Sequence, residues 1–383
     1  RLPLSACIPG RRPKKGRDEF LSRPRFLAIS EFGPRSIVYH EGSRYRINKV
    51  ILPVRENVTG DEDIVTTAAK LCDNCGYLHY SPGGAGPDLC ERCGSALPAA
   101  LGSLFRLQNV STKRADQINA DEEERMRIGY EIRTGIRFAE HGGRPASRIG
   151  VAMGANGQLA RLTYGDAATI WRINLGWLRR ANGDQHGFVL DIERGYWAKN
   201  DQDSEDDDQD DPMSPRTRRV IPYVEDWRNC LLFETLSPVD TAVMASLQAA
   251  LKNAIGVVYQ LEESELAAEP LPSLDDRRLI LFYEAAEGGA GVLRRLLDEP
   301  QALANVARQA LEICHFDPET GQDLRRAQGS KEDCEAACYD CLMSYTNQMD
   351  HRILDRHKVK DILMALAVCK VESSPSVVPR SQH

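Results

Sequence analysis

Alternation of hydrophobic and polar positions dominates the first half of the chain and predicts β-strands, because successive side chains of a strand point to opposite faces. The predicted strands lie at 26–29, 36–39, 45–52, 130–138, 158–164, 171–175 and 187–192. A turn at 40–43 joins two of them as a hairpin. One buried and one solvated face is typical of antiparallel sheets. We therefore expect an antiparallel β domain over residues 25–198.

The pattern changes after residue 217, where apolar runs and helical spacing replace alternation. Two mostly apolar strands are predicted at 229–233 and 278–283. Between them, Asp240 can cap a helix that extends to about residue 261, since apolar side chains recur along one face. Further helices are predicted at 292–297, 300–314, 338–347 and 352–369. Strand–helix alternation predicts an α/β domain over 217–370, so the expected fold class is mixed α+β.

Three segments are predicted to lie outside the folded domains. Residues 1–24 form a basic arm rich in Pro and Gly, and 371–383 form a disordered tail. Residues 199–216 hold a block with eight acids in twelve positions, which repels itself and predicts a disordered linker. An acidic stretch can also mimic nucleic acid and cover a basic site, although a solvated linker is the simpler interpretation.

The composition is that of a soluble globular protein, with 42% hydrophobic and 27% charged residues among 383. No apolar run approaches the roughly 20 residues of a membrane helix. No signal peptide opens the chain, and the paired cysteines described below indicate a reducing compartment, so we expect a cytoplasmic protein without a membrane partner. The net charge is −7, yet the first fifty residues hold 12 Lys and Arg against 4 Asp and Glu. This asymmetry indicates either one localised contact with an anionic partner or a merely solvated arm.

Four cysteines form two CxxC pairs with 14 residues between them, a spacing typical of a zinc ribbon. The predicted ligands are Cys72, Cys75, Cys90 and Cys93, in a ribbon over 68–98 that is inserted into the β domain. A glycine follows each pair and permits the positive φ that such turns need. Two disulfides are the alternative, but they require an oxidising compartment.

A second set of four cysteines has looser spacing: Cys314, Cys334, Cys338 and Cys341. The last three recur at i, i+4 and i+7, so a helix or its first turn would place them on one face. Cys314 would return from the end of the preceding helix to complete a tetrahedron. His315 and His351 could each replace one thiolate, or serve structural roles. We expect two structural Zn²⁺ ions in the chain.

A glycine-rich loop, EGGAG, follows the predicted strand at 278–283. Its glycines, Gly288, Gly289 and Gly291, can let backbone N–H groups approach an anion, or can simply permit tight packing. Glu284 and Glu287 could hold Mg²⁺ in a metal-dependent nuclease. No Lys or Asp partner follows at a recognised spacing, which favours structural or solvated carboxylates. No P-loop or other ATPase motif occurs, so we do not expect this chain alone to hydrolyse nucleotides.

One stretch carries a family resemblance most clearly: Cys334-Glu-Ala-Ala-Cys-Tyr-Asp-Cys-Leu-Met-Ser-Tyr-Thr-Asn-Gln348, followed by His351 and Leu354-Asp-Arg356. Further stretches are 23–34, 39–42, 223–229, 261–266 and 283–293. Together they resemble the C-terminal zinc-binding module of MrfA-like superfamily-2 DNA helicases. Related modules occur in the helicase-associated subunit of the DISARM anti-phage system. The resemblance covers roughly 20–50 and 217–360.

The resemblance implies a four-cysteine zinc site at Cys314, Cys334, Cys338 and Cys341. It also implies a DNA-engaging accessory module of an ATP-dependent helicase, in DNA repair or phage defence. The ATPase lobes of that helicase would lie in the same polypeptide as this module or in a partner subunit. The chain begins with Arg rather than Met, so we expect a C-terminal piece of a longer helicase.

DNA, as a single strand or a duplex junction, is the expected nucleic-acid partner. The residues expected to neutralise phosphates are Arg11, Arg12, Lys14, Lys15 and Arg17. Trp171 and Trp177 could stack on unpaired bases or belong to the core. The alternatives are the nuclease that uses Glu284 and Glu287, and a non-enzymatic scaffold for protein interactions.

Overall fold

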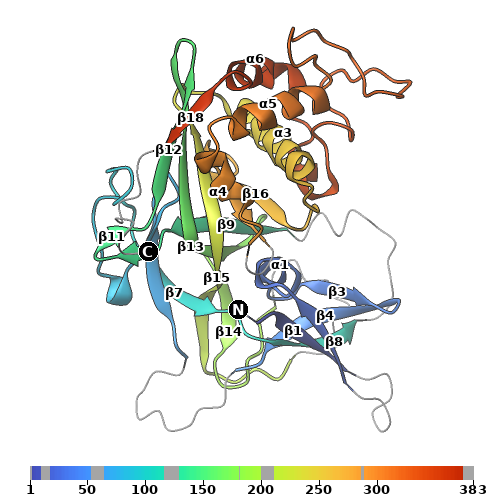
Figure 1. Ribbon diagram of the computed structural model, residues 1–383. Helices are drawn as coiled ribbons and strands as arrows, with labels where there is room; N and C mark the ends of the chain where they lie inside the picture. Colours follow the sequence, from blue (N-terminus) through green and yellow to red (C-terminus); the bar gives the residue numbers. More distant parts are fainter. Residues whose placement is uncertain are drawn as a thin grey trace. The chain divides into compact units, whose positions relative to one another are not determined.

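The computed structural model describes residues 2–9, 18–52, 64–115, 129–180, 182–199, 211–285 and 289–373 (Figure 1). The chain divides into two compact units that interleave in sequence. Unit 1 comprises 1–72, 78–135 and 170–226, and unit 2 comprises 73–77, 136–169 and 227–383. Two long strands, β13 (Gly157–Trp177) and β15 (Thr217–Thr235), contribute residues to both units. Because these strands pass from one unit into the other, neither unit is one continuous stretch of sequence.

Unit 1 contains a five-stranded sheet in the order β2-β1-β8-β4-β3. Its strands are β1 (Leu4–Ile8), β2 (Glu19–Arg23), β3 (Ile37–His40), β4 (Ser43–Val50) and β8 (Val110–Ala115). A helix, α1 (Arg25–Glu31), lies where the apolar run 26–29 predicted a strand, so that prediction is wrong. A short apolar run does not distinguish helix from strand by periodicity. Here the chain turns after Pro24 and buries Ala28 and Ile29 of the helix in a core.

The remaining strands of unit 1 surround an aromatic core. They are β5 (Thr67–Leu71), β6 (Leu78–Tyr80), β7 (Leu101–Arg106), β14 (Phe188–Asp191) and the adjoining parts of β13 and β15; a short 3₁₀ turn (Pro82–Gly84) follows β6. Trp171 is 3% exposed and stacks on Tyr223 with ring centroids 4.3 Å apart. Trp177 is 9% exposed and stacks on Tyr130 at 4.6 Å. Both tryptophans therefore serve the core rather than an open stacking platform.

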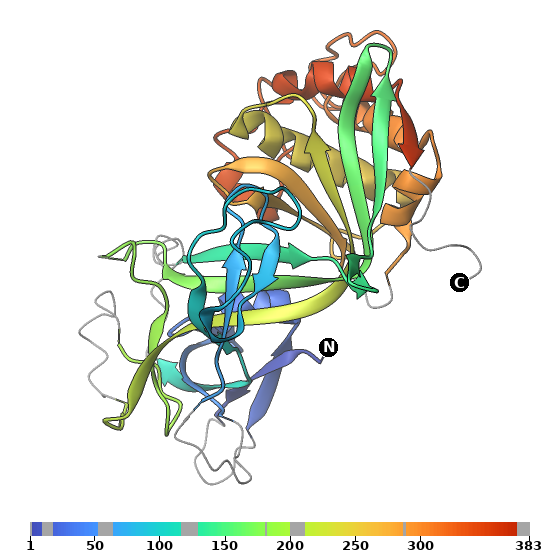
Figure 2. The same cartoon turned by 90° about the vertical axis from the view of Figure 1, so that its left-hand side faces the viewer.

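Unit 2 is a sheet covered on one face by helices (Figures 1 and 2). Its strands follow the order β18-β12-β13-β15-β17-β16, where β12 is Arg148–Gly154, β16 Leu266–Pro272, β17 Arg277–Glu284 and β18 Lys370–Ser373. The helices are α3 (Thr241–Tyr259), α4 (Val292–Asp298), α5 (Ala302–Ile313) and α6 (Arg356–Leu366). The smaller pair β10 (Glu140–His141) and β11 (Arg144–Pro145) stands apart, and β9 (Tyr130–Arg137) pairs with β13. The predicted mixed α+β class is confirmed.

Helix α3 is the centre of the unit 2 core. Asp240 caps it as predicted, its carboxylate accepting a hydrogen bond of 2.8 Å from the Val243 N–H. By length and composition alone this helix could cross a membrane, which the sequence pattern did not predict. Half of its apolar window is buried, and its buried face packs with α5 and α6 around Leu247, Leu251 and Leu363. That packing is typical of a core helix.

The predicted helix at 338–347 is wrong. Residues 339–342 form a turn in which the N–H groups of Cys341, Leu342 and Met343 all donate to the carbonyl of Cys338, and a 3₁₀ helix (Tyr345–Asp350) follows. Helix α6 then begins at Arg356, capped by Asp355. Because three N–H groups donate to the Cys338 carbonyl, the chain forms a tight turn here instead of a regular helix, in which each carbonyl accepts from the N–H four residues later.

Candidate metal centres

The four cysteines of the predicted ribbon come together. The donor atoms of Cys72, Cys75, Cys90 and Cys93 all lie within 4.8 Å of one another. The first pair follows the end of β5, and the second lies in a turn where the Gly94 N–H donates to the Cys90 carbonyl at 2.8 Å. Gly76 and Gly94 adopt φ of 71° and 73°, as the spacing required. The arrangement fits a closed, tetrahedral, four-thiolate zinc site.

A histidine that the sequence analysis did not single out supports this cluster. His79 on β6 is fully buried, and its Nε2 lies 3.4 Å from the Cys90 Sγ, while its Nδ1 lies 3.7 Å from a carboxylate oxygen of Glu91. An N–H donor on a thiolate orients the ligand and stabilises its charge. In the sequence, a single histidine in an apolar strand gives no sign of a role beside a metal ligand. The contact between His79 and Cys90 becomes visible only in the folded structure.

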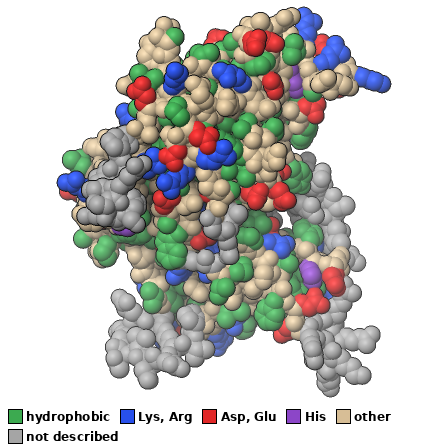
Figure 3. All heavy atoms as spheres, viewed as in Figure 1, with side chains coloured by type: hydrophobic (Ala, Val, Ile, Leu, Met, Phe, Trp, Pro, Cys, Tyr) green, Lys and Arg blue, Asp and Glu red, His purple; other side chains and the backbone are tan. Residues whose placement is uncertain are grey.

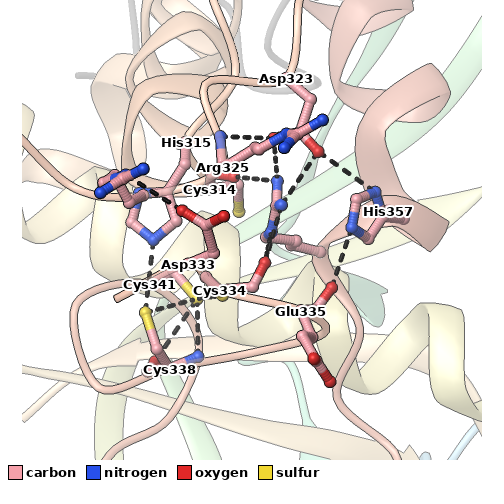
Figure 4. A network of polar contacts seen from close by, with 12 residues as sticks. Cys314, His315, Asp323, Arg325, Asp333, Cys334, Glu335, Cys338, Cys341 and His357 are labelled. Atoms are coloured by element: carbon pink, nitrogen blue, oxygen red, sulfur yellow. Dashed lines mark hydrogen bonds and ion pairs between the residues drawn. The ribbon is translucent and has the colours of Figure 1, made fainter. Parts of the chain in front are cut away.

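The second cluster combines three cysteines with a histidine. The donor atoms of His315, Cys334, Cys338 and Cys341 lie within 4.8 Å of one another (Figure 4). Cys338 Sγ lies 3.5 Å from Cys341 Sγ and 3.3 Å from His315 Nε2, and Cys334 Sγ lies 3.8 Å from Cys341 Sγ. Zinc–sulfur bonds of about 2.3 Å place tetrahedral ligands about 3.8 Å apart. These separations therefore fit the edges of a zinc tetrahedron.

The structure favours His315 over the predicted Cys314 as the fourth ligand. Cys314 ends helix α5 and is fully buried, and it is not part of the set of donor atoms that lie within 4.8 Å of one another. His315 has a φ of 61°, the left-handed conformation, and its ring points toward Cys338 (Figure 4). Burial lowers the pKa of His315, and the nearby Arg356 charge lowers it further. Both effects favour the neutral imidazole, the form that binds metals.

A buried arginine connects the second cluster to the core. Arg356 is 1% exposed and donates to the carbonyl of Cys334 at 2.8 and 3.1 Å and to that of Cys314 at 3.3 Å. It also forms a two-pronged ion pair with Asp323 at 2.7 and 3.0 Å. These hydrogen bonds hold the pKa of the Asp323 carboxyl below its usual range. Arg356 thus fixes the backbone on both sides of the donor set.

We expect Arg356→Met to destabilise unit 2 by about 3–5 kcal/mol, because it removes the ion pair with Asp323 and leaves two buried carbonyls without their donor. Loss of the hydrogen bonds from Arg356 to the Cys334 and Cys314 carbonyls should also weaken metal binding about 10–100-fold. Chemical denaturation and chelator competition measure the two effects. Arg352→Met is the matched control, since Arg352 is exposed. Equal stability of the two variants would contradict the role given to Arg356.

Glu284 has a structural role that accounts for the glycine-rich loop. It is 1% exposed, and its carboxylate accepts hydrogen bonds from the N–H groups of Gly291 and Leu293, both at 3.1 Å, and from Asn229 at 3.2 Å. A side chain on Gly289 would overlap this carboxylate. The anion at the start of α4 is therefore the protein's own. Glu287 and Gly288 lie outside the described residues.

Replacement of Glu284 with Gln should cost about 1–3 kcal/mol, because an amide NH₂ would face buried N–H donors. Urea denaturation of this variant against Glu262→Gln, a change at an exposed carboxylate, measures the difference. If both variants unfold at the same urea concentration as the parent, Glu284 does not anchor the loop.

Comparison with known proteins places the second cluster in a described family. Residues 247–342 match the family model of the MrfA Zn-binding domain, a range that contains all the candidate ligands from 314 to 341. The chain contains an MrfA-like zinc-binding module. It has no match among curated proteins.

Among solved structures, the chain is similar to three of the DUF1998 helicase MrfA. The DNA-bound structure is 10% identical, with a TM-score of 0.40, and the alignment covers 95% of this chain and 34% of that one. A second structure is 10% identical, with a TM-score of 0.34 and coverages of 92% and 33%. A third, bound to DNA and AMPPNP, is 9% identical, with a TM-score of 0.33 and coverages of 94% and 31%. The chain thus spans about a third of their length.

Proposed function

We propose that this chain is a non-catalytic module with two zinc ions that engages DNA for an ATP-dependent superfamily-2 helicase, in DNA repair or phage defence within the cytoplasm. The observation that carries the proposal is the donor set His315, Cys334, Cys338 and Cys341 inside the range matched by the MrfA Zn-binding domain. ATPase lobes would come from the same polypeptide or from a partner subunit.

Both zinc ions are proposed to be structural. Each donor set supplies four protein ligands, which leaves no open position for a water or a substrate. The second set is also part of the hydrophobic core, because Cys334 and Cys341 pack with Leu342 and Leu363. Metal analysis of freshly purified, reduced protein should find two zinc ions per chain, and one or none would contradict the proposal.

DNA binding without cleavage tests the function as a whole. The full chain should bind labelled single-stranded or junction DNA with an affinity that falls as salt rises, because phosphate contacts release counterions. It should not cleave DNA in Mg²⁺ or Mn²⁺, since Glu284 is committed to the start of α4. Cleavage would favour the nuclease alternative. Absence of salt-sensitive binding would favour a scaffold for protein interactions.

The basic arm stays a prediction, because residues 11–17 lie outside the described part of the chain. Five phosphate contacts there would contribute about 3.5 to the slope of log K against log salt on single strands, and about 4.5 on duplex. Replacing Arg11, Arg12, Lys14, Lys15 and Arg17 with Ala should flatten the slope by up to these amounts. A parental slope in this variant would remove the arm from the interface.

A further inference from the structure

Unit 1 carries a third group of potential metal ligands, which belongs to neither zinc cluster. One imidazole nitrogen and two carboxylate oxygens, from His40, Glu19 and Glu41, lie within 4.8 Å of one another. Acidic and basic side chains lie interspersed on the molecular face in Figure 3, so two neighbouring carboxylates alone would not mark a site. The imidazole is the distinguishing member, because the chain has only 8 histidines and imidazole nitrogen is a preferred ligand of transition metals.

Two separate parts of the fold bring these three residues together. Glu19 is the first residue of β2, whereas His40 ends β3 and Glu41 opens the turn to β4. Glu41 and Gly42 have φ of 44° and 70°, and two successive left-handed residues are typical of a two-residue hairpin turn. This tight turn holds the backbone of Glu41 directly beside His40, so two of the three ligands come from one short, well-defined segment.

The strands that carry the group are the opposite edges of the five-stranded sheet. In the described part of the chain, β2 is hydrogen-bonded to β1 at one end of the strand order, and β3 is hydrogen-bonded to β4 at the other. Nevertheless, His40 Nε2 lies 2.8 Å from a carboxylate oxygen of Glu19. The sheet therefore curls until its two edges approach each other at this point, around a core that contains Ile29 and Ile47. An ion bound to the group would join these edges.

The separations and the donor types fit a transition-metal ion. Metal–nitrogen and metal–oxygen bonds of about 2.0–2.2 Å place neighbouring ligands about 2.8–3.6 Å apart. The 2.8 Å between His40 and Glu19 lies at the short end of this range, so an ion can take the place of the hydrogen between them. The His40 side chain is 27% exposed and that of Glu19 59%, which leaves the group accessible to an ion from solvent. Three protein ligands also leave at least one position to water, unlike the two closed clusters.

We propose that Glu19, His40 and Glu41 bind one divalent transition-metal ion, with Zn²⁺ as its probe, and that this ion joins the two edges of the five-stranded sheet. The ligand class follows from the donors, because imidazole together with carboxylates suits Zn²⁺ and related ions, whereas Ca²⁺ and Mg²⁺ prefer oxygen ligands alone. The ligands are accessible and the coordination is open, so this ion exchanges with solvent and leaves on dialysis, while the two structural ions stay. The site is independent of the proposed DNA-engaging function.

The test uses the untagged full chain, dialysed against metal-free buffer with its structural zinc ions in place. Zn²⁺ is titrated into the protein by calorimetry, and thermal unfolding is recorded with and without added Zn²⁺. His40→Ala removes the nitrogen ligand, and Glu19→Gln together with Glu41→Gln removes both anionic ligands at nearly constant volume. His141→Ala is the matched control: His141 is exposed beside Glu140, yet it belongs to no group of three donors in the described part of the chain.

The parent and the control should bind one further Zn²⁺ per chain, and saturating Zn²⁺ should raise their unfolding midpoint by about 5 °C, because the ion binds only the folded sheet. Both site variants should lose the extra ion and the rise, while they keep the two structural zinc ions. Either site variant is sufficient if the other does not fold. A parent that binds no further ion, a site variant that still binds it, or a control that loses it would overturn the site. Binding without a higher midpoint would overturn the joining of the sheet edges.

Discussion

A Cys338→Ser variant is expected to retain one zinc ion of two and to lose the cooperative folding of unit 2. Cys338 Sγ lies within 3.5 Å of both the His315 and the Cys341 donors, and its carbonyl organises the turn between them. Structural zinc contributes about 10–16 kcal/mol in small domains. That is comparable to the roughly 5–15 kcal/mol by which a domain is stable. The core around α3, α5 and α6 should therefore not survive the loss.

Cys369→Ser is the matched control for this experiment. Cys369 is fully buried in the same core, and burial raises the pKa of its thiol to about 11, yet it belongs to neither donor set. The control should keep two zinc ions and unfold cooperatively, with a modest loss of stability. Zinc content and near-ultraviolet circular dichroism measure the outcome. A Cys338→Ser protein with two zinc ions and a cooperative transition would show that this thiol is not a ligand.

Features governed by local chemistry could be predicted from the sequence. The ribbon cluster follows from two pairs with fixed spacing, and the start of α3 follows from Asp240 before an apolar periodicity. Both depend on residues close in sequence, since 14 residues separate the two cysteine pairs and Asp240 directly precedes its helix. The strand at 278–283 was predictable for the same reason, since a continuous apolar run between turns has few alternatives.

Features that depend on long-range contacts could not be predicted. The glycine-rich loop indicated an anion site, but the anion is the Glu284 carboxylate, which lies on β17 beside β15 and accepts a hydrogen bond at the start of α4. His79 and Arg356 gain their roles in the same way, through cysteines 11 and 22 positions distant.

The fourth ligand of the second cluster gives the sharpest test of the geometry. Cys314 and His315 are neighbours, and spacing alone favoured the cysteine, because it completes a set of four thiolates. The left-handed backbone at His315 instead turns the imidazole toward Cys338, at 3.3 Å. His315→Ala should therefore release zinc to a chelator far more readily than the parent protein does. Cys314→Ala should behave like the parent in zinc content.

Cobalt substitution separates loss of a ligand from general loss of stability. Co²⁺ bound to thiolates gives charge-transfer absorption that grows with the number of sulfur ligands, and tetrahedral zinc sites accept this ion. His315→Cys should raise that absorption by one thiolate while retaining two metal ions, because the new sulfur takes the position of the imidazole. Cys314→Ala should leave the absorption unchanged. If Cys314→Ala instead lowers it and His315→Ala does not affect metal binding, the site holds four cysteines and the histidine only lies beside it.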